Sequence, residues 1–171
     1  ERLANHFNDL AFIMLDTGFS FGGSHGSRLR ERVMQWHERL TGSRFLRGVI
    51  TFGGVTRDID ETTIQALHDD LEMLEKDFME VIDITKESDS MLNRLKGTGT
   101  LDAQVAKDLG AVGIAARACG LEVDARADYA YAAYDMMQFG VMTEKTGDVY
   151  ARFRVRVREV TQSFRLLNQA L

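Results

Sequence analysis

An apolar stripe in the middle of the chain constrains the fold more than any other feature of the sequence. Between residues 58 and 83, apolar side chains recur at alternating steps of three and four: Ile64, Leu67, Leu71, Leu74, Phe78 and Val81. This spacing puts them on one face of an α-helix and is typical of helices that pack against other helices. Asp58 and Glu61 have the spacing of a capping box and predict the start of this helix. The opposite face is acidic, and we expect it to contact solvent or, alternatively, a basic partner.

The C-terminal stretch contains two competing periodicities. Residues 152–158 alternate between arginine and apolar side chains, which is typical of a strand. The helical pattern is longer, because steps of three and four link Val149, Phe153, Val157, Val160, Phe164, Leu167 and Leu171. Since this pattern covers six turns, we predict one long helix over about 146–171.

Helical spacing recurs elsewhere in the chain. It predicts helices over 1–17, 27–41, 84–95 and 102–109, with glycines ending several of them and Gly22-Gly23 interrupting the chain between the first two. Residues 43–57 are expected to form a loop with at most a short β-hairpin. We therefore predict a mostly all-α fold, in which five or six helices form a bundle with glycine-rich loops.

The composition limits the class of protein. A chain of 171 residues with 44% hydrophobic and 27% charged residues is typical of one globular domain, so residues 1–171 are predicted to form a single helical domain. A net charge of −5 disfavours a nucleic-acid partner. No apolar run approaches the roughly 20 residues of a transmembrane helix. The chain has one cysteine, which excludes an internal disulfide, and no proline.

One run of residues carries a specific resemblance. Residues 113–134 resemble the pattern G-x-x-A-R-x-S-G…D-x-R…P-Y-x-x-Y, with cysteine at 119 in place of serine and alanine at 130 in place of proline. This pattern is that of the large subunits of membrane-bound [NiFe] hydrogenases and of the related quinone-site subunit of respiratory complex I. The matching positions are Gly113, Arg117, Gly120, Asp124, Arg126, Tyr131 and Tyr134.

The resemblance extends over nearly the whole chain. Residues 1–6 resemble an E-R-[IL]-x-x-H helix opening, 15–19 a D-x-G segment, and 53–55 the end of P-G-G-V, with Phe52 replacing proline. The stretch 5–22 is most similar to the formate-hydrogenlyase and hydrogenase-4 type of large subunit. Further matches are the R-L-R-E of 28–31, the G-x-R of 42–44, the G-D-x-Y-x-R of 147–152, and Arg156, Glu159 and Ser163.

The resemblance implies an oxidoreductase whose metal chemistry lies outside this chain. A [NiFe] centre needs four thiolates, which the family supplies from two C-x-x-C pairs, whereas this chain has only Cys119. We therefore expect no cofactor in this chain, and interpret it as the central segment of a longer subunit, inactive when isolated. The parent would contain a [NiFe] centre, next to an iron–sulfur cluster in a partner subunit, or would act on quinone as in NADH:quinone oxidoreduction.

The same resemblance implies a place in the cell and a set of partners. The parent subunit would bind an iron–sulfur small subunit and membrane subunits, on the cytoplasmic side and peripheral to the membrane. The alternative from another class is a non-catalytic helical scaffold that has lost its metal site. An isolated chain is expected to self-associate through the helix bearing Trp36 or through the apolar stripe of 149–171.

Asp16 is the first candidate site residue. It lies at the predicted end of the first helix, where the helix dipole disfavours a carboxylate. In the complex I branch, the aspartate of D-x-G belongs to the quinone cavity, so the resemblance implies a proton-linked role for Asp16. The alternative is a surface or loop-capping aspartate.

Arg117, Asp124 and Arg126 are the other candidate site residues. An Asp-x-Arg pair beside a second arginine can form bidentate ion pairs that hold a loop. These residues either support the wall of the active site or contact substrate directly.

Seven other polar or aromatic positions have structural interpretations. His6 is expected to be a partly buried packing histidine, Tyr131 and Tyr134 to lie in the core, and Cys119 to be a small buried thiol. In the last helix, Arg152, Arg156 and Glu159 have the spacing of a salt-bridge ladder.

Overall fold

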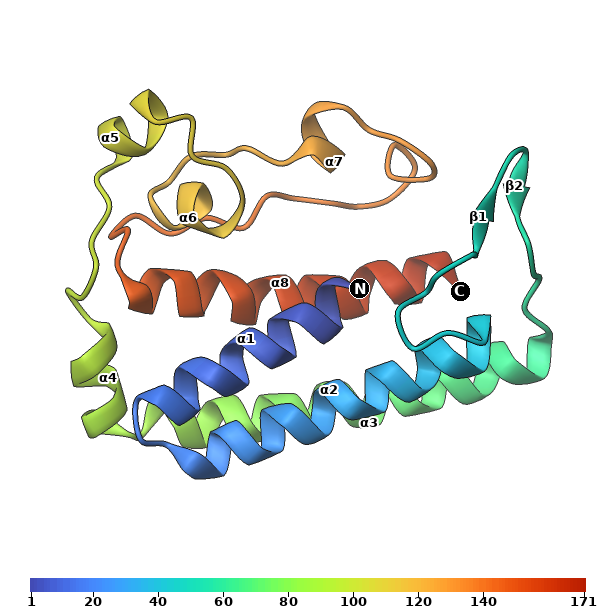
Figure 1. The fold of residues 1–171 in the computed structure, drawn as a ribbon, viewed down its shortest axis with the longest axis horizontal. Coiled ribbons are helices and arrows are strands. Elements are labelled where there is room, and N and C mark those ends of the chain that lie inside the picture. Colours follow the sequence, from blue (N-terminus) through green and yellow to red (C-terminus); the bar gives the residue numbers. More distant parts are fainter.

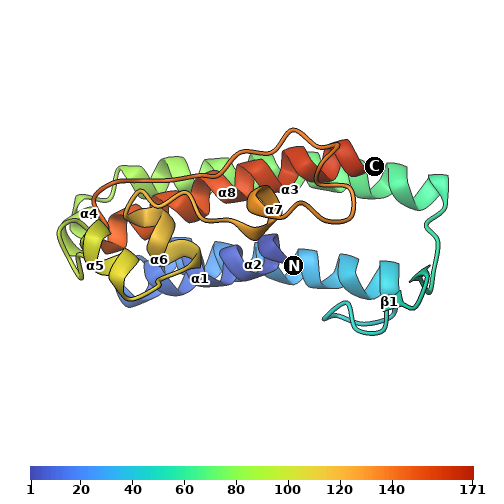
Figure 2. The same cartoon turned by 90° about the horizontal axis from the view of Figure 1, so that it is seen from above.

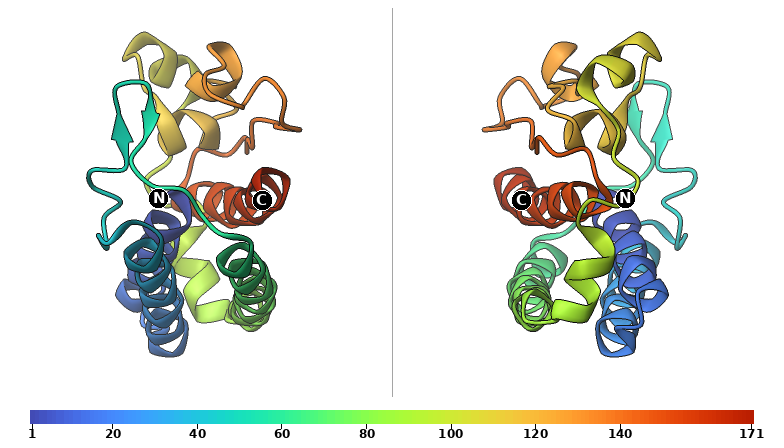
Figure 3. Two further views of the ribbon diagram at one scale, coloured as in Figure 1. Left: turned by 90° about the vertical axis from the view of Figure 1, so that its right-hand side faces the viewer. Right: turned by 90° about the vertical axis from the view of Figure 1, so that its left-hand side faces the viewer.

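Four long helices form the body of the protein. The structure is a computed structural model that describes all residues, 1–171. Its long helices are α1 (Arg2–Asp16), α2 (Ser20–Thr41), α3 (Glu61–Lys86) and α8 (Val149–Ala170). They run side by side, with α8 next to α1 and α3 (Figures 1 and 3). The predicted mostly α-helical bundle is confirmed, and the competition between strand and helix in the last segment is resolved in favour of the helix.

The core lies between these four helices. The apolar stripe of the central helix faces inward, with Leu67, Leu71 and Phe78 all buried. From α1 and α8, Phe7 and Phe164 meet at a ring-centroid distance of 6.4 Å, and Phe7 also lies 5.3 Å from Phe78. Each fully buried side chain of this size contributes roughly 1.5–3 kcal/mol. The stripe predicted from spacing alone therefore makes the central contact of the bundle.

The turn between α1 and α2 is shorter than the sequence suggested. Gly22 and Gly23 were expected to interrupt the chain, but both lie inside α2, which begins at Ser20. The chain reverses at Gly18, whose φ of 85° is a left-handed conformation that favours glycine. A Cβ atom on Gly26 would stand 2.8 Å from the Cβ of Ala11 on α1. The glycines of α2 thus allow two helix backbones to approach closely.

Replacing Gly26 with leucine should lower the free energy of unfolding by about 1–3 kcal/mol, because the added side chain has no space between α1 and α2. Ser24→Leu is the matched control, since Ser24 is exposed on the same helix and should change stability by at most about 0.5 kcal/mol. Urea unfolding of both variants measures the difference. Equal unfolding midpoints would show that the helices do not approach closely at Gly26.

The connection from α2 to α3 includes a small β-hairpin. Gly42 ends α2 in the left-handed conformation expected for a glycine stop. Strands β1 (Ile50–Thr51) and β2 (Gly54–Val55) pair antiparallel and stand above α2 and α3, near the C-terminal end of α8 (Figure 1). The predicted capping residue of α3 is wrong by two positions, because Asp60 caps the helix by accepting a hydrogen bond from the Thr63 N–H.

The segment between α3 and α8 covers the outer side of α8. It contains the short helices α4 (Asp89–Leu95), α5 (Ala103–Asp108), α6 (Gly113–Ala118) and α7 (Ala125–Asp128). In Figure 1, α5 to α7 lie on the side of α8 opposite α2 and α3, and Figure 2 shows the same segment from above. Ala118 packs on Ala151 and Val155. α8 is therefore buried on two sides, which explains its mixed apolar and charged pattern. No helix is long and apolar enough to span a membrane.

The acidic face of α3 has one exception to the expected solvent contact. Asp70 is buried and accepts hydrogen bonds from the Arg32 guanidinium and from the indole N–H of Trp36. Although burial opposes ionisation, the hydrogen bond from Arg32 lowers the pKa of Asp70 below its usual value. Asp70 is thus a fixed contact between α2 and α3 rather than part of a solvated surface.

Candidate functional site

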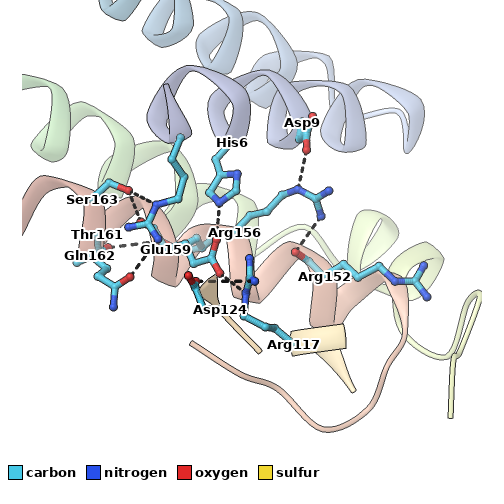
Figure 4. A network of polar contacts seen from close by, with 12 residues as sticks. His6, Asp9, Arg117, Asp124, Arg152, Arg156, Glu159, Thr161, Gln162 and Ser163 are labelled. Atoms are coloured by element: carbon cyan, nitrogen blue, oxygen red, sulfur yellow. Dashed lines mark hydrogen bonds and ion pairs between the residues drawn. The ribbon is translucent and has the colours of Figure 1, made fainter. Parts of the chain in front are cut away.

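A buried charge network joins α1, α6, α8 and the start of α7 (Figure 4). At its centre is Glu159 of α8, which is 1% exposed. Its Oε2 atom lies 2.6 Å from Nε2 of His6 on α1. Its Oε1 atom accepts a hydrogen bond of 2.7 Å from Nε of Arg117 on α6. The carboxylate therefore links two segments that are 153 and 42 residues away in the sequence.

The two partners keep Glu159 ionised. Burial alone would raise the pKa of Glu159, but the hydrogen bond from His6 and the charge of Arg117 lower it below the usual glutamate value. A buried carboxylate is tolerated only when it is paired in this way. The network is consequently a fixed ionic contact at neutral pH.

Arg117 extends the network toward α7. Its Nη1 atom donates a hydrogen bond of 3.2 Å to the carbonyl of Val123 and lies 3.9 Å from Oδ2 of Asp124. Arg117 reaches these groups because α6 is only six residues long and ends next to α8. One guanidinium thus spans the gap between Glu159 and the loop that follows α6.

Asp124 and Arg126 form a bidentate ion pair within one turn of chain. Nε and Nη2 of Arg126 donate to the two Asp124 oxygens at 2.9 and 2.6 Å, and the Arg126 backbone N–H donates at 3.1 Å. Burial would raise the pKa of Asp124, but the hydrogen bonds from Arg126 lower it overall. The same hydrogen bonds raise the pKa of Arg126. Asp124 also caps α7, so the pair fixes the entry of this short helix.

Two further arginines tie α1 to α8 at either side of His6. Nε and Nη1 of Arg2 donate to Ser163 Oγ and Gln162 Oε1 at 2.7 and 3.1 Å. Nε of Arg156 donates to Asp9 at 2.9 Å. The predicted ladder within α8 is therefore wrong, because Arg156 and Glu159 each bind a residue outside the helix.

The structure brings together three of the four predicted site residues. Arg117, Asp124 and Arg126 belong to the network, whereas Asp16 is exposed at the end of α1 and forms no side-chain hydrogen bond or ion pair. Ten residues of helix separate Asp16 from His6, which corresponds to about 15 Å along the axis. Asp16 thus lies on the protein surface, away from the buried network.

Other expectations for single residues have mixed outcomes. Cys119 is buried, as predicted, and its Sγ lies 3.1 Å from the carbonyl oxygens of Leu101 and Ala115. The prediction that two tyrosines lie in the core is wrong, because Tyr131 is 57% exposed and Tyr134 is only half-buried. Their rings contact each other at 5.2 Å in a loop without regular structure.

Sequence reasoning missed the roles of His6 and Glu159. His6 was interpreted as a packing histidine, and Glu159 was assigned to the wrong partners. The signal was present in the motifs, because the E-R-[IL]-x-x-H opening puts Arg2 and His6 on one helical face, and the R-x-x-E stretch puts Arg156 and Glu159 on another. No local pattern in the sequence indicates that these two helical faces contact each other.

Chemically, the network is suited to holding helices in register. Its carboxylates are each bound by a guanidinium group, and no group of three or more His, Cys, Asp or Glu side chains has the geometry to hold a metal ion. Arg126 is also covered by aromatic rings, at 5.8 Å from that of Tyr134 and 4.7 Å from that of Phe139. This arrangement is that of a rigid internal wall.

The chain is a helical bundle similar to a segment of the large subunits found in respiratory oxidoreductases. The chain belongs to the family described as "Respiratory-chain NADH dehydrogenase, 49 Kd subunit", which matches residues 16–171. The resemblance seen in the sequence motifs is confirmed by this match.

Individual relatives come from both branches of the family. NADH-quinone oxidoreductase subunit 4 of Thermus thermophilus is 35% identical over all of this chain, which covers 42% of that protein. Formate hydrogenlyase subunit 5 of Escherichia coli is 31% identical over all of this chain, which covers 30% of that protein. The chain thus spans less than half the length of these curated relatives.

A solved structure supports the same assignment at the level of the fold. A chain of the membrane-bound sulfane sulfur reductase, an archaeal respiratory membrane complex, superposes with a TM-score of 0.88 and 28% identity. The match covers 98% of this chain and 46% of that one.

Proposed function

We propose that this chain is the central helical part of a large subunit that transfers electrons in a membrane-associated respiratory complex. One observation carries the proposal: the motif residues that resemble the family are the same residues that meet in the buried network. They come from three separate stretches of the sequence, and a set of residues that meet through long-range contacts is harder to match by chance than a short motif. These residues are Arg2, His6, Arg117, Asp124, Arg126, Arg156, Glu159 and Ser163.

Two overall reactions of the parent complex are consistent with the family. The stretch over residues 5–22 favours the hydrogenase branch, in which the parent would evolve or consume H2 at a [NiFe] centre held by cysteines outside this chain. The family match and the quinone-oxidoreductase relatives favour the other branch, in which the parent would reduce quinone. In that branch Asp16 would have a proton-linked role at the exposed end of α1.

The proposed partner is an iron–sulfur small subunit, and the β-hairpin offers a surface for it. Residues 43–57 contain three arginines and no acidic residue, whereas the whole chain has a net charge of −5. At the tip, Phe52 is fully exposed, and Ile50 is 86% exposed. An exposed apolar tip with a basic surround is typical of a surface that binds a partner. The complex would also contain membrane subunits. Through them, the chain would lie peripheral to the membrane, on its cytoplasmic side.

Assays of the parent subunit in its complex test the proposal. Hydrogen uptake with a redox dye and NADH-dependent quinone reduction are measured in parallel, with elemental analysis for nickel. Hydrogen turnover with one nickel per complex supports the first branch, and quinone reduction without nickel supports the second. The 171-residue chain alone should bind no stoichiometric nickel or iron. A complex that retains its iron–sulfur clusters but catalyses neither reaction would overturn the proposal in favour of a scaffold.

Replacing Phe52 with serine should weaken co-purification of the small subunit at least tenfold, since burying a phenylalanine contributes roughly 1.5–3 kcal/mol. The same substitution should reduce self-association of the isolated chain. Self-association through the helix bearing Trp36 or through the apolar stripe of 149–171 stays a prediction, although the side chains of Trp36 and Phe164 are themselves buried. Val105→Ser, at an exposed apolar residue of α5, is the control. If Phe52→Ser left both sedimentation and co-purification unchanged, the hairpin would not be the docking surface.

A further inference from the structure

The strands of the β-hairpin that follows α2 do not hold it against the helices. Every residue from Ile50 to Asp60 is exposed, so neither β1 nor β2 buries a side chain. After Gly42, the chain turns back along α2 before it rises into β1 (Figure 1). The few residues between Gly42 and β1 therefore set the direction in which the hairpin points.

Arg44 ties this segment to the middle of α2. Its Nη1 and Nη2 atoms donate to the two carboxylate oxygens of Glu31 at 3.1 and 2.6 Å. Such a bidentate pair fixes the orientation of the two groups as well as their distance, because it contains two parallel hydrogen bonds. The hydrogen bond from Arg44 also lowers the pKa of Glu31 below its usual value. The pair is therefore ionised at neutral pH.

A second contact holds the backbone of the same residue. Nδ1 of the buried His37 lies 2.9 Å from the carbonyl oxygen of Arg44, and it donates the hydrogen bond because a carbonyl can only accept. Two residues later, Leu46 has a φ of 56°, in the left-handed region that non-glycine residues rarely adopt. A residue keeps such a conformation only where the surrounding contacts determine it. The bend into the hairpin is thus a fixed part of the fold.

We infer that Glu31 and Arg44 are positioning residues for partner binding, which hold the hairpin in the orientation that meets the iron–sulfur small subunit. The inference rests on the proposed docking of that subunit to the hairpin. The side chains of Arg44 and Glu31 are 38% and 46% exposed, and ion pairs as exposed as this one contribute little to global stability. Loss of the pair should therefore weaken binding, because the hairpin is no longer pre-organised, and leave the melting temperature unchanged.

Two measurements on Glu31→Gln test the inference. Nitroxide labels on Ser24→Cys and Thr51→Cys report the distance between α2 and the hairpin by pulsed electron paramagnetic resonance. Both positions are exposed, whereas the native Cys119 is buried. We expect Glu31→Gln to broaden the distribution of this distance. In the parent subunit, the same substitution should weaken binding of the small subunit about fivefold.

Glu38→Gln is the matched control, because it removes the same charge from α2. Glu38 lies 4.0 Å from Arg44, beyond hydrogen-bond distance, so its substitution should change neither the distance distribution nor the affinity. Arg44→Gln completes a double-mutant cycle with Glu31→Gln. If the two side chains act as one pair, the double variant binds no more weakly than Arg44→Gln alone. Additive losses of affinity would show that they act independently and would overturn the inference.

The two measurements also separate this inference from the proposed docking surface. An unchanged distance distribution in Glu31→Gln would overturn the inference, whatever the affinity. A broadened distribution with wild-type affinity would overturn it as well if Phe52→Ser weakens binding, because the hairpin would then dock without a fixed orientation. If neither Glu31→Gln nor Phe52→Ser weakens binding, the hairpin is not the docking surface, and the role in partner binding is excluded with it.

Discussion

Replacing Glu159 with glutamine should lower the free energy of unfolding by about 3–5 kcal/mol, which is the usual cost of removing one charged partner from a buried ion pair. The neutral amide would leave the buried Arg117 without its counter-charge. It would also place N–H donors beside a guanidinium that can only donate. Guanidinium chloride unfolding followed by circular dichroism measures the change. Because the network links α1, α6 and α8, the loss should appear as one cooperative transition.

The matched control is Glu72→Gln on the outer face of α3. Glu72 is 70% exposed, and its carboxylate lies 3.9 Å from His68. Such an exposed pair contributes at most about 1 kcal/mol. A Glu159→Gln variant no less stable than Glu72→Gln would mean that Glu159 is hydrated rather than buried.

The effect of Glu159→Gln should also depend on pH. Since the folded state lowers the pKa of Glu159 below its ordinary value of 4.5, ionisation stabilises the fold above that pH. The contribution is lost as pH falls through the lower pKa of the folded state. The stability difference between wild type and variant should therefore be largest near neutral pH and shrink in acid. A difference that stays constant down to the acid transition would contradict this assignment.

The helices could be predicted from the sequence because burial repeats with the helical period. The stripe from Leu67 to Val81 and the long C-terminal helix both follow from spacing, and both are buried as expected. Glycine was less informative. A glycine can end a helix or let two helices approach, and local sequence does not distinguish these uses, so the start of α2 at Ser20 was missed.

The site was predictable only in part, for a related reason. Asp124 and Arg126 are two residues apart, so their pairing is local and could be anticipated from D-x-R. The contact between His6 and Glu159 depends on how α1 and α8 cross, which no local pattern encodes. The spacing of Arg152, Arg156 and Glu159 predicted ion pairs within α8, whereas Glu159 pairs with His6 and Arg117 outside that helix.

Replacing Arg126 with alanine should abolish or sharply reduce turnover of the parent complex. The side chain of Arg126 is only 17% exposed, and that of its partner Asp124 is 7% exposed. Its loss would leave Asp124 with the backbone N–H of residue 126 and, as its only cation, the distant Arg117 at 3.9 Å, and it would remove the cation between Tyr134 and Phe139. The loop 124–139 would then lose the two side-chain hydrogen bonds that hold it to Asp124, and the wall that it forms would shift. A stability loss of about 3 kcal/mol is expected as well.

Arg154→Ala provides the comparison that separates a positional effect from a general loss of charge. Arg154 is 50% exposed on α8 and pairs with Glu144 at 3.2 Å, so its removal should cost at most about 1 kcal/mol and leave turnover unchanged. Activity and melting temperature of both variants are measured in the assembled complex. If Arg126→Ala retained wild-type values for both, the D-x-R segment would be a passive surface loop. A variant with reduced turnover but a normal melting temperature would instead indicate direct contact between Arg126 and the reacting groups.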